Sequence, residues 1–317
     1  MLSADRVQVL ALDGGGLRGL FSAHILACLE RDLGVTIRDH FDLITGTSAG
    51  GLIALALGAG IAPSDIVEAY AQLATMVFPP RRRRNWLRRI FRPTYSVDAL
   101  RVAVESLLGA RVLGDARTRL VIPAYDVARG AVHVFKTPHH PRLVRDGAVP
   151  MVDVAVATAA APTYFRAPAV DDVRLVDGGL WASNPSVVGI AEAVSMLDAP
   201  LDAIRVLNVG TTDPIGAHPR KLDDAGVWRW APRIVPVTLT ASARAAAGTA
   251  AHLVGHDDYI RVDARAPADA FQLDRAHAGD LLGLASSVAR EHSPVFTKRY
   301  ADHVATPFLG PVTQEAT

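Results

Sequence analysis

Two tight turns rich in glycine, each between an apolar strand and a helix, limit the folds open to this chain of 317 residues. The first predicted strand, Val7–Leu12, is apolar almost throughout and runs into the sequence DGGGLRG. The second, at 41–45, runs into GTSAG, and an apolar helix follows almost without a loop. Continuous apolar strands are typical of parallel sheets covered on both faces. Strand–turn–helix units therefore predict an α/β fold with a mainly parallel central sheet flanked by helices on both faces.

The rest of the chain continues the alternation of strands and helices. We expect further strands at 119–125, 131–136, 173–176, 204–209 and 259–262. We expect further helices at 20–33, 63–76, 96–108, 151–161, 185–197, 236–253 and 276–290. Because no internal repeat and no linker-like stretch divides the chain, we predict one domain over 1–317, with a motif-bearing core at about 7–210 completed by 211–317.

The composition limits which binding partners and which cellular compartment we expect for the protein. The 33 basic and 32 acidic residues give a net charge of +1, which predicts neither DNA nor RNA as a partner. The lone cysteine, Cys28, excludes an intramolecular disulfide and fits a buried thiol in a reducing cytoplasm. The longest apolar run, 49–62, has 14 residues, fewer than the roughly 20 that cross a bilayer. Without a signal-peptide pattern at the start, we expect a cytoplasmic protein whose membrane contact is peripheral.

The first glycine turn has the spacing of a dinucleotide-binding loop. Residues 14–19 match G-x-G-x-x-G between a strand and a helix. That fingerprint requires an acidic residue at the end of the second strand to hold a ribose. Asp39 and Asp42 instead come before or at the start of that strand, and no Lys-Ser/Thr pair follows the glycines as in a P-loop. The context therefore disfavours nucleotide binding at this loop.

The second turn fits the G-x-S-x-G pattern of a nucleophile elbow. It places Ser48 between a strand and a helix, so that the serine hydroxyl stands above the sheet edge and the N–H of Ala49 faces an oxyanion formed there. A serine needs a base, and the outstanding acid is Asp177, which ends a short apolar strand before two glycines. No histidine stands out as a third member. A generic Ser–His–Asp esterase nevertheless stays open at this point.

The motifs together resemble the patatin-like phospholipase family. They are DGGGLRG at 13–19, GTSAG at 46–50, ATAAAPTYF at 157–165 and DGGLWASNP at 177–185. The resemblance covers at least residues 7–210, and within the family the chain is similar to compact bacterial members. Those members include effectors of antiphage signalling systems in which a cyclic oligonucleotide switches on the degradation of membrane lipids.

The resemblance implies a lipid acyl hydrolase that uses a Ser–Asp dyad without histidine. Ser48 would be the nucleophile and Asp177 its base, and an acyl-serine intermediate would be hydrolysed by water without metal or cofactor. The N–H groups of Gly15 and Gly16 would form the oxyanion hole, with Gly14 or Ala49 as a further donor. Arg18 would meet the lipid phosphate or support the loop. The alternative outside enzymes is a catalytically idle module that binds membranes or nucleotides.

The stretch 79–92 carries seven arginines and no acid. Without these arginines the remaining chain would have a charge of −6 instead of +1. If residues 85–92 form a helix, their apolar side chains share one face, which suits the surface of an anionic membrane. The alternative is a lid whose apolar face packs on the domain while the arginines are solvated. Arginines also suit the phosphates of a cyclic di- or trinucleotide. The candidate contacts to a membrane or messenger are Arg81, Arg82, Arg83, Arg84, Trp86, Arg88, Arg89 and Phe91.

Overall fold

The computed structural model describes residues 6–78, 93–215, 223–224, 226–267, 278–306 and 308. Its main sheet has the strand order β5-β6-β3-β2-β1-β7-β9, with β4 beside β3, and a small second sheet pairs β8 with β10. The strands are β1 (Val7–Leu12), β2 (Leu43–Gly46), β3 (Arg119–Asp126), β4 (Ala131–Lys136), β5 (Ala169–Val170), β6 (Val173–Asp177), β7 (Ile204–Val209), β8 (Asp213–Ile215), β9 (Tyr259–Val262) and β10 (Arg265–Pro267). The five central strands β3, β2, β1, β7 and β9 are parallel, whereas β4, β5 and β6 form an antiparallel edge.

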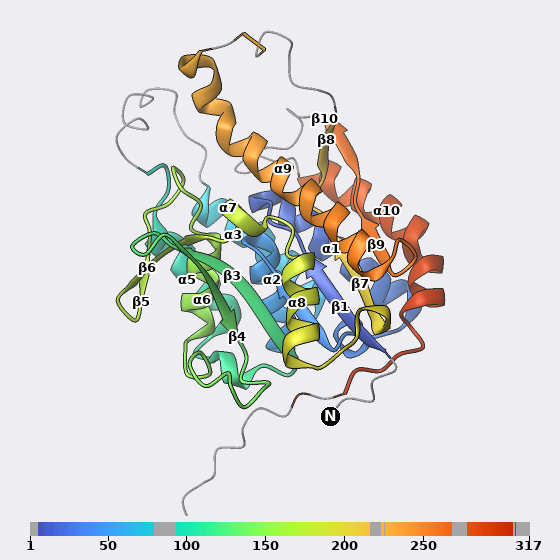
Figure 1. Ribbon diagram of the computed structural model, residues 1–317. Helices are drawn as coiled ribbons and strands as arrows, with labels where there is room; N and C mark the ends of the chain where they lie inside the picture. Colours follow the sequence, from blue (N-terminus) through green and yellow to red (C-terminus); the bar gives the residue numbers. More distant parts are fainter. Residues whose placement is uncertain are drawn as a thin grey trace, which may run out of the picture.

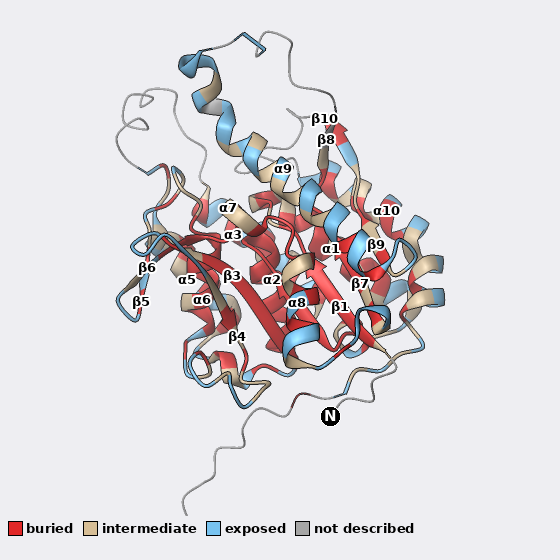
Figure 2. Cartoon of the chain, viewed as in Figure 1, coloured by how far each residue is buried: buried red, intermediate tan, exposed pale blue. Residues whose placement is uncertain are grey.

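Helices cover both faces of this sheet (Figure 1). The helices are α1 (Gly19–Leu33), α2 (Ala49–Gly58), α3 (Pro63–Val77), α5 (Val97–Leu108), α6 (Met151–Ala159), α7 (Gly179–Ala182), α8 (Ser186–Met196), α9 (Val227–Val254) and α10 (Ala278–Arg299). The larger hydrophobic cluster joins one face to α1, α2, α3, α5, α6 and α10, and the smaller one joins the other face to α8 and the end of α9. Strands β1 and β2 are buried throughout, and β3 and β7 are buried at all but one residue each (Figure 2), as expected for apolar strands covered on both faces. The predicted mainly parallel, two-faced architecture is confirmed.

Two helices are longer than the sequence predicts, because prolines that look like breakers lie inside them. The helix predicted at 236–253 begins at Val227, and the helix predicted at 276–290 continues to Arg299. In α10, Pro294 costs about 3 kcal/mol relative to a good helix former. Two residues later Phe296 is buried and packs against Phe41. Packing of this last stretch against the core offsets the local cost.

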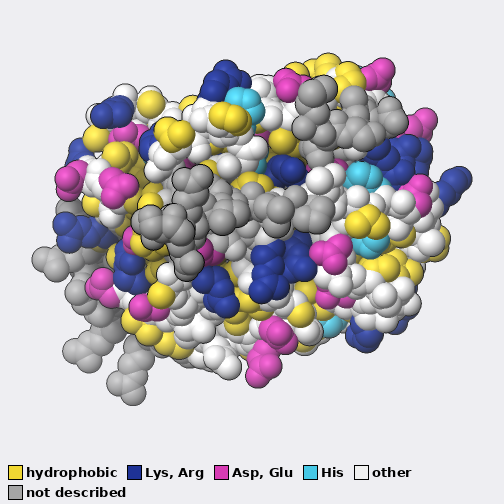
Figure 3. Space-filling model, turned by 90° about the horizontal axis from the view of Figure 1, so that it is seen from below, with side chains coloured by type: hydrophobic (Ala, Val, Ile, Leu, Met, Phe, Trp, Pro, Cys, Tyr) yellow, Lys and Arg dark blue, Asp and Glu magenta, His cyan; other side chains and the backbone are white. Residues whose placement is uncertain are grey.

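Four elements matter for the site because they meet at the carboxyl ends of the parallel strands. β1 leads into the glycine loop, β2 into the elbow, and β7 and β9 end beside them. The face away from these carboxyl ends is seen from below in Figure 3. Basic, acidic and hydrophobic side chains are interspersed on it. In the part of the chain that the structure describes, no helix has the length and apolar character needed to cross a bilayer.

Candidate active site

The second glycine turn forms a strained elbow between β2 and α2. Ser48 has φ 55° and ψ −120°, a sparsely populated conformation with positive φ that costs an ordinary residue about 1–3 kcal/mol. The helix starts so close to β1 that a Cβ on Gly50 would lie 2.2 Å from the carbonyl oxygen of Leu12. Glycine is therefore required at position 50. The strained backbone of Ser48 is the conformation predicted for a nucleophile elbow.

Asp177, at the end of β6, lies directly against this serine. The hydroxyl of Ser48 donates to Asp177 Oδ2 at 2.6 Å, and the N–H of Gly179 donates to Asp177 Oδ1 at 2.7 Å. Both side chains are buried. Burial raises the pKa of Asp177 to about 6, while the two hydrogen bonds oppose that rise. A carboxylate with this pKa can accept a proton near neutral pH.

The glycine loop after β1 is fixed at its first residue. Gly14 donates its N–H to the carbonyl of Ser183 at 2.9 Å, and its own carbonyl accepts from Thr211 Oγ1 at 2.8 Å. The N–H of Gly14 is therefore already used, which removes Gly14 from the predicted oxyanion donors. The prediction missed this because the acceptor lies in a distant loop, so that local sequence gives no sign of it.

Gly15, Gly16 and Ala49 line the same cavity as Ser48. Their N–H groups have no acceptor among the described residues. Close packing holds the loop in place, because a Cβ on Gly15 would lie 2.3 Å from Thr211 Oγ1. These three N–H groups are therefore the donors that the geometry leaves for an oxyanion.

Arg18 lies in the loop and faces backbone carbonyls. Its Nη1 donates to the carbonyl of Thr212 at 3.0 Å and its Nε to that of Gly15 at 3.3 Å. Of the two roles predicted for this arginine, these contacts favour support of the loop. Arg18 also lines the cavity, so that contact with a substrate phosphate stays a prediction.

The cavity above the dyad is lined mostly by apolar side chains, which come from helices except for Phe78 and Phe165. They are Leu52, Tyr70, Leu73, Phe78, Leu100, Phe165, Leu180, Val235 and Leu239. Such a lining suits a hydrocarbon chain, with the polar groups of the dyad and loop at one side. None of the described histidines lines it.

Two of those histidines have other partners. His139 contacts Glu192 at 3.1 Å, and His303 contacts Asp42 at 2.7 Å. His277 lies outside the described residues. In the part of the chain that the structure describes, the geometry pairs Ser48 with Asp177 and gives a Ser–His–Asp triad no support.

Comparison with known proteins decides the family. The family model described as "Patatin-like phospholipase" matches residues 10–188, more than half of the chain. The chain belongs to the patatin-like phospholipase family. The predicted resemblance, fold and lipid acyl hydrolase class are thereby confirmed at the level of the family.

Relatives extend the likeness beyond that region. A Vibrio cholerae serotype O1 protein named "cGAMP-activated phospholipase" is 34% identical, and the match covers 94% of this chain and 93% of that protein. An Escherichia coli protein (strain TW11681) with the same name is 37% identical over 75% of this chain and 73% of its own. Among solved structures, VipD from Legionella pneumophila has a TM-score of 0.50 at 11% identity. That match covers 93% of this chain and 67% of VipD, and it shows the fold alone.

Thr158, on α6, is a site residue that the sequence did not single out. Its Oγ1 accepts the N–H of Ser48 at 3.0 Å and donates to the carbonyl of Pro123 at 2.6 Å. The hydroxyl thus ties the patatin-like elbow to β3. The available signal was one threonine in a helix of small and apolar residues, within the ATAAAPTYF stretch that carries the family resemblance.

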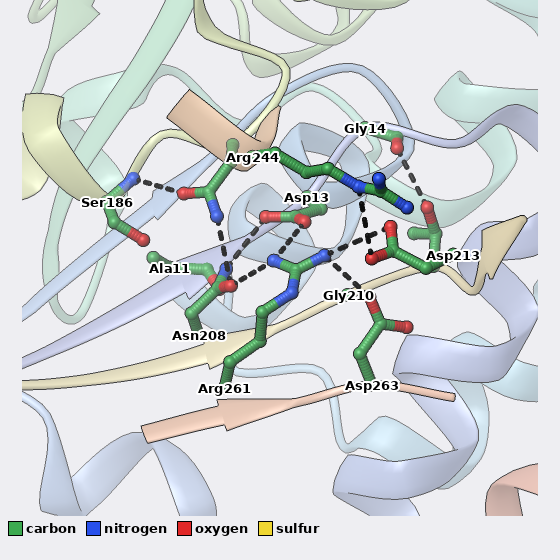
Figure 4. A network of polar contacts seen from close by, with 12 residues as sticks. Ala11, Asp13, Gly14, Ser186, Asn208, Gly210, Asp213, Arg244, Arg261 and Asp263 are labelled. Atoms are coloured by element: carbon green, nitrogen blue, oxygen red, sulfur yellow. Dashed lines mark hydrogen bonds and ion pairs between the residues drawn. The ribbon is translucent and has the colours of Figure 1, made fainter. Parts of the chain in front are cut away.

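A partly buried polar cluster at the ends of β1, β7 and β9 is the second feature that was missed. It is centred on Arg261, which pairs with Asp13 at 2.7 Å and Asp263 at 2.5 Å (Figure 4). Asp13 precedes the glycine loop, but Arg261 lies outside the region that the family model matches.

The arginine-rich segment falls outside the described residues, so that its predicted contacts stay predictions. They are Arg81, Arg82, Arg83, Arg84, Trp86, Arg88, Arg89 and Phe91.

Proposed function

We propose that this chain hydrolyses fatty-acyl esters of membrane phospholipids through an acyl-Ser48 intermediate. The observation that carries the proposal is the 2.6 Å hydrogen bond from the Ser48 hydroxyl to the buried carboxylate of Asp177, at the floor of an apolar cavity. Family membership supplies the class of reaction, and the cavity fits an acyl chain.

The residues have distinct roles in this reaction. Asp177 accepts the proton of Ser48 as Oγ attacks the ester carbonyl carbon. The oxyanion then receives hydrogen bonds from the N–H groups of Gly15, Gly16 and Ala49. As the carbon–oxygen bond breaks, protonated Asp177 returns its proton to the departing lysolipid alkoxide. In the second half, Asp177 takes a proton from water as the water oxygen attacks the acyl-serine carbonyl carbon. As the bond to Ser48 Oγ breaks, Asp177 returns this proton to Oγ, and the fatty acid is released.

Substitution of the dyad tests the proposal. Ser48→Ala and Asp177→Ala are each expected to abolish fatty-acid release from phospholipid vesicles, measured by mass spectrometry of the products. Ser48→Ala should also abolish labelling by a fluorophosphonate probe. Ser286→Ala, at the contact of α1 with α10, serves as a matched serine control and should keep both signals. Fatty-acid release by a folded Ser48→Ala protein, or labelling of another serine, would contradict the mechanism.

We also propose that the enzyme acts peripherally at the cytoplasmic face of a membrane. Support comes from α9, whose residues Val235 and Leu239 line the cavity while its first turns are exposed (Figure 2). Trp228 at that end is 95% exposed, and tryptophan is typical of segments that lie in a membrane interface. Trp228→Ala should lower binding to anionic vesicles and hydrolysis of their lipids while leaving cleavage of a soluble short-chain ester unchanged. Val304→Ala, at another exposed site, should leave all three unchanged; equal effects of both variants would contradict the proposal.

Activation by a cyclic oligonucleotide is a further part of the proposal, and with it a place in antiphage defence. Its support is the name of the Vibrio cholerae and Escherichia coli relatives. Calorimetry with cGAMP, paired with vesicle hydrolysis with and without cGAMP, tests it. We expect binding at micromolar concentration and faster release of fatty acid. Absence of both binding and activation by cyclic di- and trinucleotides would remove it.

A further inference from the structure

The polar cluster around Arg261 connects three neighbouring strands at the level of the glycine loop. Ala11 of β1 pairs with Asn208 of β7, and Asn208 pairs with Arg261 of β9. Directly paired residues of parallel strands point to the same face of a sheet. Figure 4 accordingly shows the side chains of Asn208 and Arg261 converging on Asp13, one residue before the loop.

Arg261 holds the cluster together through its guanidinium. Its Nη1 donates to Asp13 Oδ2 at 2.7 Å and also to Asn208 Oδ1. Its Nη2 donates to Asp263 Oδ2 at 2.5 Å and lies 3.8 Å from Asp213 Oδ1. A planar guanidinium can bind several acceptors in a fixed geometry, which a lysine ammonium cannot do.

Asp13 passes this restraint to the start of the loop. Its carboxylate also accepts from Asn208 Nδ2 at 2.7 Å, and its N–H donates to the carbonyl of Val209 at 3.0 Å. The next residue is Gly14, whose N–H donates to the carbonyl of Ser183 and whose carbonyl accepts from Thr211 Oγ1. The position of Asp13 therefore sets where Gly15 and Gly16 begin.

A second path runs through Asp263. Its Oδ1 accepts the N–H of Thr212 at 2.9 Å, and the carbonyl of Thr212 accepts from Arg18 at 3.0 Å. Arg18 in turn donates to the carbonyl of Gly15. Arg261 thus contacts carboxylates on both paths that end on the glycine loop.

The charge of Arg261 opposes the rise that burial causes in the pKa of Asp13, and the hydrogen bond from Asn208 acts in the same direction. Asp13 is 3% exposed, and a buried carboxylate without a cation is strongly disfavoured. Removal of the guanidinium would leave this carboxylate unpaired, and either protonation of Asp13 or its movement would loosen the loop.

We propose that Arg261 is a positioning residue for the oxyanion hole, acting through Asp13 on the N–H groups of Gly15 and Gly16. This inference rests on the proposed function, because it assigns the residue a part in hydrolysis at Ser48. Misplacement of catalytic groups by about 1 Å can cost about 100-fold in rate.

The test compares Arg261→Met, Asp13→Asn and the double variant with wild type. The substrate is a soluble p-nitrophenyl ester, and a trifluoromethyl ketone mimics the tetrahedral oxyanion. Each single variant should lower kcat about 10–100-fold with KM nearly unchanged, and the ketone should bind weaker by the same factor as kcat/KM falls. Because both residues act in one chain of contacts, the double variant should lose no more than the worse single variant.

Two further variants separate positioning from general damage. Arg244→Met removes an arginine that lies 3.8 Å from Asp213 at the rim of the same cluster, and it should change kcat less than twofold. Arg261→Lys, which keeps the charge without the fork, should recover part of the lost kcat. If Arg261→Met does not fold, the double variant, which leaves no Asp13 carboxylate unpaired, carries the same kcat and KM comparison.

Each outcome bears on the inference. A wild-type kcat in Arg261→Met or in the double variant overturns it. Losses that multiply in the double variant, a rise in KM alone, or ketone binding that does not weaken overturn it as well. Failure of the proposed function is recognisable separately, because wild type itself would then neither cleave the ester nor be labelled at Ser48. That outcome overturns both.

Discussion

Replacing Asp177 by asparagine should abolish hydrolysis and at the same time stabilise the protein. The carboxylate is buried, and its pKa is raised from 3.8 to about 6 by burial. The folded state therefore holds the proton more tightly than the unfolded state does. Stability contributed by this group is present at low pH and is lost as the pH rises from about 4 to about 6. The asparagine side chain has nearly the same shape as aspartate and does not ionise. The variant therefore does not lose this stability as the pH rises.

The magnitude follows from the pKa values. A difference of about two units between the folded and unfolded states corresponds to about 3 kcal/mol once the group is fully ionised. About half of it, roughly 1.4 kcal/mol, falls between pH 5 and pH 8. We therefore expect the free energy of unfolding of Asp177→Asn, relative to wild type, to grow by about that amount over this interval.

Urea denaturation followed by circular dichroism at pH 5 and pH 8 measures this difference. Asp13, whose pKa burial also raises to about 6, is present in both proteins and cancels from the comparison. Ser48→Ala is the inactive control that keeps the carboxylate, and its stability should decline with pH at least as much as that of wild type, because loss of the Ser48 hydrogen bond raises the pKa of Asp177 further. A variant that is less stable than wild type at pH 8, or a stability difference that does not change with pH, would contradict this expectation.

Three other predictions concern activity. Because the ionised form of Asp177 is the base, kcat/KM for a soluble ester should rise about tenfold from pH 5 to a plateau above pH 7, and a profile flat across pH 6 would contradict this role. Thr158→Val removes the acceptor of the nucleophile's N–H, which we expect to lower the free energy of unfolding by about 1–3 kcal/mol and to lower kcat. Thr158→Ser should restore both, and failure to do so would show that the hydroxyl is not what matters. Gly15→Ala places a methyl group 2.3 Å from Thr211 Oγ1 and should lower kcat about 100-fold or more, whereas Gly283→Ala, with open space around it, should not.

Local sequence was sufficient for the features that depend on neighbours along the chain. The apolar run of β1, the small residues of the elbow and the acid at the end of β6 each appear within a few residues. Ser48 and Asp177 could therefore be predicted, and the structure places them 2.6 Å apart. Ser48 follows β2 and Asp177 ends β6, and the end of each strand can be predicted from the residues around it.

Features that depend on the order of strands in the sheet could not be predicted in this way. Arg261 and Asp13 are 248 positions apart and meet only because β7 lies between β1 and β9. The N–H of Gly14 is used by Ser183 for a similar reason. In the sequence, Arg261 is one arginine in a short strand, and nothing near it indicates a partner.

The two buried carboxylates beside the nucleophile show why such partners decide function. Burial raises the pKa of both Asp13 and Asp177 to about 6. Asp13 is paired with the guanidinium of Arg261, whereas the hydrogen-bond donors of Asp177 are a hydroxyl and a backbone N–H, which carry no charge. A cation at Asp177 would stabilise its ionised form and weaken it as a base, and the lack of one at Asp13 would leave the loop without its anchor. Because the two pKa values are similar, the contacts of each carboxylate separate their roles: Asp177 faces the Ser48 hydroxyl and can accept its proton, whereas Asp13 faces Arg261 and holds the loop.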